Sequence, residues 1–239
     1  MRNISGWGLS LLLAASATHS QTPTRPTVVE LYTSEGCNSC PPAEAMIGVL
    51  TQQRPDVIAL AFHVTYWDGI GWRDRFDLPE ATERQQQYQH ALHLSSVYTP
   101  QLVIDGQRDL VGNNDPRTVP ASTRPQTVAL QIAVRDQQVN VSLGAGAPGS
   151  GAAAGTNDVL LVSYLHEGVS KITGGENAGR ELHEFNIVRS IRKLGTWKGE
   201  ATSFAVPLKS LPVDATQVAV LVQAPNEGPI VGSAAQSLR

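Results

Sequence analysis

The spacing of apolar residues changes near residue 113, and this change limits the folds that the chain can adopt more than any other feature. Between residues 27 and 112, strand-like apolar runs alternate with segments whose apolar side chains recur every three to four positions. Beyond residue 126, apolar and polar residues alternate in steps of two, and a proline-punctuated stretch separates the two patterns. We therefore expect two domains, covering about residues 25–115 and 126–239.

The first expected domain has the element order of an α/β protein with a mixed sheet and flanking helices. Two helical patterns, at residues 41–53 and 79–94, each begin with proline, which is tolerated in the first turn of a helix. The strand-like segments are residues 27–33, 57–64, 101–105 and 108–111. The second expected domain has six or more strand-like segments and no helical pattern, which indicates an all-β sandwich-like fold.

Two cysteines, Cys37 and Cys40, follow the first strand-like segment and are the only cysteines of the chain. Pro41 and Pro42 lack N–H groups, so we expect the helix to begin at about Cys40 and to leave Cys37 just ahead of it. The positive end of a helix favours an anion, and the pKa of a cysteine placed there can fall from about 8.5 to about 3.5–7.5. We expect Cys37 to be the exposed nucleophile of a thiol–disulfide exchange and Cys40 to resolve the mixed disulfide.

Two other interpretations of the cysteine pair stay open. The pair can form a static disulfide in a protein-docking module, although so small a loop contributes little chain-entropy stabilisation. With His63 as a third ligand it can instead bind copper, which would make the protein a non-catalytic binding module. Exchange itself needs no organic cofactor, because the electrons come from a thiol- or disulfide-bearing protein partner.

The order strand, Cys-x-x-Cys, helix, strand, helix, followed by Thr99-Pro100 and a hairpin, resembles the thioredoxin fold. The resemblance implies that Thr99–Pro100 is a cis peptide, that Pro100 packs near Cys37, and that the Thr99 backbone pairs with a bound peptide. It also implies that Glu30 lies near the position of a buried acid beneath Cys40, where it would accept the proton of that thiol. Strand alternation leaves open whether Glu30 faces this site or solvent.

A closer resemblance is carried by four motifs spread over residues 30–189, namely ELYTSEGCNSCPPAE, FHVTYWDGIGWRDRF, TPQLVIDG and GRELHEFNIVR. Their combination is similar to an exported family known as domain of unknown function 1223. The resemblance implies a thioredoxin-like fold and an exported protein, and it implies no substrate.

Aromatic residues concentrate between the second strand-like segment and the second helix. Trp67 and Trp72 in this segment either line a groove that binds a peptide substrate or belong to a small satellite core with a charged rim. Farther along the chain, the polar cluster at residues 180–186 is expected to be an interface or edge feature, because strand alternation sends adjacent side chains to opposite faces.

Composition and the N-terminus exclude several classes of function. The net charge is −3, so there is no basic surface field for nucleic acid. The sequence has no phosphate-binding loop and no hydrolase motif. Residues 1–20 combine one arginine, an apolar stretch too short to span a membrane and an Ala-Ser-Ala cleavage pattern, which predicts a signal peptide. We expect a periplasmic or secreted protein whose mature form does not span the membrane.

Overall fold

In the computed structural model, residues 24–124, 126–146 and 155–239 are described, so the expected signal peptide at residues 1–20 lies outside the described part. The described chain has two α-helices, α1 (Pro41–Gln53) and α2 (Pro79–Ala91). It also has three short 3₁₀ helices, η1 (Thr65–Trp67), η2 (Pro116–Thr118) and η3 (Leu208–Ser210). α1 has the predicted bounds, whereas α2 ends at Ala91 and not at residue 94.

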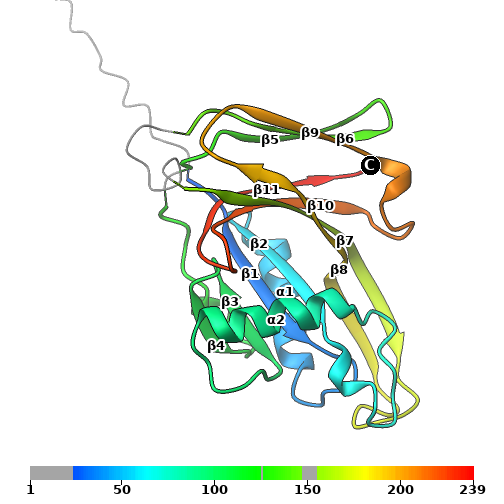
Figure 1. Ribbon diagram of the computed structural model, residues 1–239. Helices are drawn as coiled ribbons and strands as arrows, with labels where there is room; N and C mark the ends of the chain where they lie inside the picture. The colour runs from blue at the N-terminus through cyan, green and yellow to red at the C-terminus, as the bar shows by residue number, and fades with distance from the viewer. Residues whose placement is uncertain (1–23, 125, 147–154) are drawn as a thin grey trace, which may run out of the picture.

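The described strands form two sheets (Figure 1). The larger sheet has eight strands in the order β11-β10-β7-β8-β2-β1-β3-β4, and the smaller has three in the order β5-β6-β9. The strands of the larger sheet are β1 (Thr27–Thr33), β2 (Val57–His63), β3 (Gln101–Ile104), β4 (Arg108–Val111), β7 (Asn157–Lys171), β8 (Glu181–Trp197), β10 (Gln217–Gln223) and β11 (Ile230–Ser237). Those of the smaller sheet are β5 (Leu130–Arg135), β6 (Gln138–Leu143) and β9 (Thr202–Pro207).

The predicted fold class, an α/β thioredoxin-like domain followed by an all-β sandwich-like domain, is wrong. The mixed sheet does not stop at the strands before residue 113, because β8 pairs in parallel with β2, with Ala61 opposite Ile187. β8, β7, β10 and β11 thereby extend the sheet, and β7 and β8 are 15 and 17 residues long. The protein is mostly β and is built around one sheet that draws strands from both parts of the chain. Apolar periodicity predicts where strands lie but not which strand edges pair.

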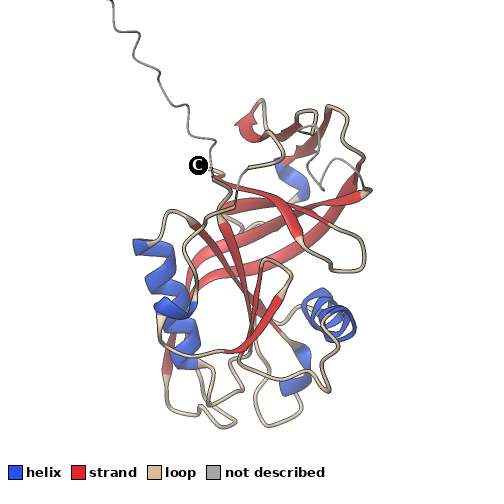
Figure 2. Ribbon diagram, turned by 90° about the vertical axis from the view of Figure 1, so that its left-hand side faces the viewer, coloured by secondary structure: helices blue, strands red, loops and turns tan. Residues whose placement is uncertain are grey.

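The central strands are covered on both faces by helices. All seven residues of β2 are buried, as expected for a continuous apolar run with neighbours on both faces. On β1, Val28 and Tyr32 pack in the core that contains Tyr88 of α2, whereas Leu31 packs in the core that contains Ile47 of α1. α1 and α2 therefore cover opposite faces of the larger sheet, as the views in Figures 1 and 2 show.

A third core lies between the two sheets. Val141 of β6 and Val206 of β9 pack there with Leu161 of β7 and Val220 of β10, next to the buried Trp197. The smaller sheet thus covers the part of the larger sheet formed by β7, β10 and β11 (Figure 1). The alternation of apolar and polar residues along these strands gives each sheet one apolar face, and the two apolar faces pack together. One of the two sheets is the larger sheet, whose other strands are covered by α1 and α2.

α1 also lies against β8, a strand from the distant half of the chain. The contact is close because Gly48 has no side chain: a Cβ atom there would lie 2.7 Å from the ring of Phe185. This contact joins the middle of α1 to the fifth residue of β8.

Candidate functional site

The two cysteines form a disulfide at the N-terminus of α1, with their Cα atoms 5.4 Å apart. β1 ends at Thr33, and the N–H of Cys37 donates to the carbonyl of Ser34, so the chain turns sharply before the helix. The helix begins where the two prolines predict, with Cys40 as its N-cap residue. The disulfide is therefore held between the end of a central strand and the start of a helix.

The first turn of α1 has few free N–H groups. Pro41 and Pro42 have none, and the N–H groups of Ala43 and Glu44 donate to the carbonyl of Cys40. A thiolate at this end of the helix would consequently be stabilised by the helix dipole, and not by direct donation from these groups.

Both cysteines are buried, with 0% of either residue exposed, so the expectation of an exposed Cys37 is wrong for the oxidised protein. Only Asn38 and Ser39 between them are exposed. The loop between β7 and β8 (residues 172–180, here called the covering loop) contacts the backbone of this turn. Its Asn177 donates from Nδ2 to the carbonyls of Glu35, at 2.8 Å, and of Cys37, at 3.0 Å.

The covering loop was not predicted to belong to the site. Asn177 is 140 residues from Cys37 in the chain, and no local pattern links two such segments. In the same loop, Glu176 accepts a hydrogen bond from the N–H of Asn38 at 3.4 Å, and Asn177 accepts one from Arg180 at 2.9 Å. The covering loop is thus held to the cysteine turn (residues 34–40) by hydrogen bonds between its side chains and the backbone of that turn.

All four expected substrate-binding residues lie around the cysteine turn. The Thr99–Pro100 peptide is cis, as the family resemblance implied. Trp67 donates from Nε1 to the hydroxyl of Thr99 at 2.8 Å, and its Cβ would lie 3.2 Å from a Cβ placed on Gly36, next to Cys37. Pro100 lies beside the first turn of α1, because a Cβ on Gly112 would lie 2.7 Å from Pro100 and 3.1 Å from Ala43.

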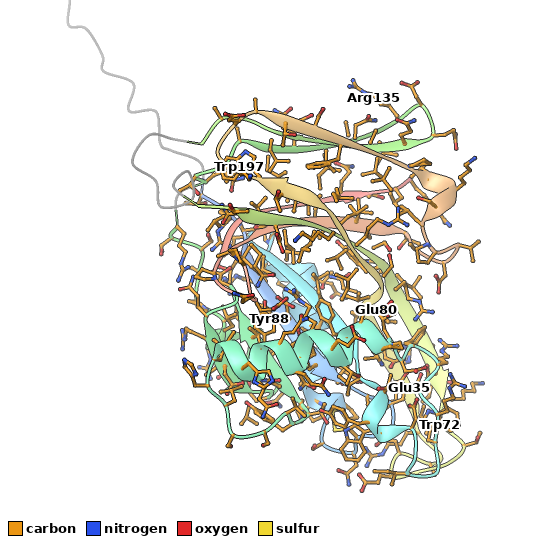
Figure 3. The ribbon with its side chains drawn as sticks, in the orientation of Figure 1. Glu35, Trp72, Glu80, Tyr88, Arg135 and Trp197 are labelled. Carbon is orange, nitrogen blue, oxygen red and sulfur yellow. A yellow bond between two sulfur atoms is a disulfide. The ribbon has the colours of Figure 1, made fainter. Side chains whose placement is uncertain are left out.

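Trp72, the fourth expected residue, contacts both the cysteine turn and the covering loop. It donates from Nε1 to Oε2 of the buried Glu35 at 2.6 Å. A Cβ on Gly175 of the covering loop would lie 3.0 Å from Trp72. Glu35 and Trp72 lie near one another at the end of the molecule far from the smaller sheet (Figure 3). In the described structure Trp72 therefore packs within the fold.

Glu30 is not brought to the cysteines. Its carboxylate accepts hydrogen bonds from Arg84 at 2.7 and 2.9 Å and from Tyr88 at 2.7 Å, both on α2. Tyr32, two residues along β1, donates to it at 3.1 Å. Because α2 and α1 cover opposite faces of the sheet, Glu30 lies on the face away from Cys40. The expected proton transfer from Cys40 to Glu30 has no support in this arrangement.

A buried cluster of ionisable side chains lies where the ends of β1 and β2 meet α1 and β8. His63, the last residue of β2, contacts Asp74 through Nδ1 at 2.7 Å. Glu44 of α1 accepts a hydrogen bond from Thr33 at 2.6 Å. Glu184 of β8 lies 3.8 Å from Nε2 of His63. The cluster was missed because Glu44, His63 and Glu184 come from three separate elements and Asp74 from a connecting loop.

The electrostatics of this cluster are dominated by burial and by His63. Burial alone would lower the pKa of His63, but the charge of Asp74 and its hydrogen bond raise that pKa to about 10. Burial raises the pKa of Glu44 to about 7 and that of Glu184 to about 8, against the attraction of the histidine. The polar cluster at residues 180–186, expected to be an interface or edge feature, includes the start of β8, where His183 is exposed and alternation turns Glu184 inward.

The alternative copper site of Cys37, Cys40 and His63 is not assembled in the oxidised protein. The two sulfur atoms are bonded to one another and are not thiolate ligands. Among the described residues, the group whose ligand atoms lie within 4.8 Å of one another consists of Glu44, His63 and Glu184.

The fold and the site define a mostly β protein with a buried disulfide at a helix start and a histidine–carboxylate cluster beside it. Among the described residues, no helix has the length and apolar character to cross a membrane. The sequence pattern of the family described as "Protein of unknown function (DUF1223)" matches residues 28–223. The chain belongs to this family.

Two solved structures are similar to this chain. Protein AGR_C_4864 from Agrobacterium tumefaciens has 27% sequence identity and a TM-score of 0.75, over 91% of this chain and 96% of that one. HBP35 of Porphyromonas gingivalis has 14% identity and a TM-score of 0.59, over 90% of this chain and 76% of that one, a likeness in fold alone. No curated protein matches the sequence.

Proposed function

We propose that the protein carries out thiol–disulfide exchange through Cys37 and Cys40, in the periplasm or after secretion. The observation that carries the proposal is the disulfide, which joins two residues only three positions apart at the start of α1. A closed loop of four residues gives about 2 kcal/mol of chain-entropy stabilisation, against about 4.7 kcal/mol for a loop of 100 residues. Redox chemistry therefore accounts for the pair better than stability does.

The exchange begins when a thiolate of a partner protein attacks Sγ of Cys37. The bond between Cys37 and Cys40 breaks, and Cys40 leaves as a thiolate. A second partner thiolate attacks the mixed disulfide and releases Cys37. The partner loses two electrons and gains a disulfide, while the two cysteines gain these electrons and take up the protons that the partner thiols release. The reverse sequence reduces a partner disulfide.

The end of α1 helps this chemistry by stabilising the leaving thiolate. A helix dipole stabilises an anion at its N-terminus by up to about 2 kcal/mol in partly buried geometries. Thr99, Pro100 and Trp67 border the cysteine turn, and we assign the contacts with the partner to them.

We propose that the covering loop moves to give access to the disulfide, because both cysteines are fully buried. Asn177 anchors the loop through two hydrogen bonds to the backbone of the cysteine turn. Loops of this kind open locally with free energies well below that of global unfolding. We propose that a partner reaches Cys37 only in the open form, so that the closed loop protects the disulfide from small reductants.

A second candidate function is that of a docking module with an inert disulfide. The complete burial of both cysteines is the observation that favours it. The two functions differ in how the disulfide is reduced. An inert disulfide is reduced only when the protein unfolds globally, whereas an exchange disulfide reacts in the folded protein through local opening.

The test is a mixed-disulfide trap in the native compartment. Cys40→Ser leaves Cys37 without its resolving partner, so we expect a covalent adduct with a partner protein that dithiothreitol releases. Cys37→Ser is the matched control and should capture nothing comparable. The absence of any adduct with Cys40→Ser, in a protein whose folding is verified by circular dichroism, would favour the docking module and overturn the proposal.

A further inference from the structure

The buried cluster beside the start of α1 presents three ligand groups to one point. Glu44 comes from α1, His63 from the end of β2 and Glu184 from β8. Their ligand atoms all lie within 4.8 Å of one another, and all three residues are buried. No two of these groups are close in the sequence, so their convergence is a property of the tertiary structure.

Each of the three side chains is held from behind by another residue. Asp74 contacts Nδ1 of His63 at 2.7 Å, which is the carboxylate–histidine arrangement that orients histidines toward metal ions. Ser170 donates to Oε2 of Glu184 at 2.8 Å. Thr33 donates to Oε1 of Glu44 at 2.6 Å. These contacts leave one nitrogen of the histidine and one oxygen of each carboxylate available for a ligand.

Two of these atoms point into the cluster without a hydrogen-bond partner among the described residues. They are Nε2 of His63 and Oε1 of Glu184, 3.8 Å apart, in side chains that are 0% and 1% exposed. Leaving a buried polar atom unpaired costs about 1–3 kcal/mol, so buried groups of this kind normally have a partner. A bound cation would supply one partner for both atoms.

The charge of the cluster also calls for a cation. Glu35, Glu44, Asp74 and Glu184 are all buried. In the described part of the chain, the cationic side chains paired with these four are His63 and the half-exposed Arg75, 3.8 Å from Glu35. Buried carboxylates of like charge are expensive unless protons or a cation neutralise them.

The ligand set selects the class of ion. Imidazole with carboxylates suits zinc, manganese and iron, whereas magnesium and calcium prefer oxygen ligands alone and copper(I) prefers sulfur. With metal–ligand distances of about 2.0–2.2 Å, two ligands of one ion lie at most about 4.3 Å apart. The 3.8 Å between Nε2 of His63 and Oε1 of Glu184 is within this limit. All pairs of ligand atoms among the three residues lie within 4.8 Å, which exceeds the limit by at most about 0.5 Å.

We infer that Glu44, His63 and Glu184 bind one divalent first-row transition-metal ion, with Asp74 as the positioning residue behind the histidine. The inference does not rest on thiol–disulfide exchange, since the ligands do not include the cysteines. It places the ion beside the helix that carries the disulfide, because Glu44 shares the first turn of α1 with Cys40.

The test measures zinc and cobalt binding to the purified protein with its disulfide intact. After removal of metal with a chelator, we expect one Zn²⁺ per chain and a visible absorption band on addition of Co²⁺. Glu184→Gln keeps the size of the side chain and should weaken zinc binding more than about tenfold; Asp74→Asn should weaken it about 10–100-fold. A Cys37→Ser/Cys40→Ser double variant should bind zinc like the parent protein.

The matched control is the exposed pair His183 and Glu181 on the same strand, 3.5 Å apart. His183→Asn should leave zinc binding unchanged. A second measurement covers the case in which a core variant fails to fold: a hundredfold excess of zinc over its dissociation constant should raise the Tm of the parent protein by about 5–10 °C. The inference would be overturned if the parent protein bound no zinc and showed no shift in Tm. It would also be overturned if Glu184→Gln kept zinc binding while His183→Asn or the cysteine double variant lost it.

Discussion

The covering loop should control how fast the disulfide is reduced, and Asn177→Ala tests this. The substitution removes the two hydrogen bonds from Asn177 to the carbonyls of Glu35 and Cys37. Each such bond contributes about 0.5–1.5 kcal/mol, so the closed form should lose about 1–3 kcal/mol relative to the open form. Since 1.4 kcal/mol is a factor of ten, the open population should rise about 5- to 150-fold.

The assay is reduction of the folded protein by a small phosphine, followed by quenching with an alkylating agent and mass spectrometry. The reduction rate should rise in proportion to the open population. Asn140→Ala, in β6 of the smaller sheet, is the matched control and should leave the rate unchanged. Unfolding in urea must be measured in parallel. Equal reduction rates for Asn177→Ala and the parent would refute the gating role of the loop, as would a rate that follows only the global free energy of unfolding.

Three further predictions concern the fold around the site. Arg84→Met leaves the buried carboxylate of Glu30 without its cation and should lower the free energy of unfolding, measured in urea, by about 3–5 kcal/mol. If the rate of disulfide reduction changed by more than this loss of stability accounts for, Glu30 would belong to the cysteine site. Gly48→Ala should lower Tm despite the better helix propensity of alanine, because the new Cβ would lie 2.7 Å from the ring of Phe185 and overpacking costs about 1–3 kcal/mol. An unchanged or higher Tm would contradict the close contact between α1 and β8. Hydrogen bonds from Arg54 lower the pKa of Asp56 to about 2, so the stabilisation by this carboxylate is present above about pH 4 and lost as the pH falls toward 2. Because the pair is partly exposed to solvent, Asp56→Asn should lower the free energy of unfolding by under about 1 kcal/mol at pH 7 and by nearly nothing at pH 2. An equal loss at both pH values would exclude the ion pair.

Local features of the chain were predictable because their causes lie within a few residues. Pro41 and Pro42 cannot donate hydrogen bonds, so the helix had to begin next to Cys40, and it does. The apolar run of residues 57–64 was expected to be a strand buried on both faces, and β2 (Val57–His63) is such a strand. The adjacency of the cysteines and the helix start, and with it the disulfide, follows from this local order.

The orientation of individual site residues was decided only by the tertiary structure. From its position in the sequence, Glu30 was a reasonable candidate for a residue beside Cys40. In the structure α2 and α1 cover opposite faces of the sheet, and Glu30 lies on the α2 face, where Arg84 donates a hydrogen bond to it. Periodicity predicts that alternate residues of a strand face opposite ways, but it does not say which element covers which face.

The sheet order and the surroundings of the disulfide were likewise set by contacts between distant segments. Nothing in the local spacing of β2 shows that its free edge pairs with β8, which carries Glu184 to His63, or that Asn177 closes over Cys37. Secondary structure follows from side-chain spacing and backbone chemistry over a few residues. Strand partners and loop contacts depend instead on which surfaces fit once the whole chain has folded, and here those contacts both bury the disulfide and assemble the cluster beside it.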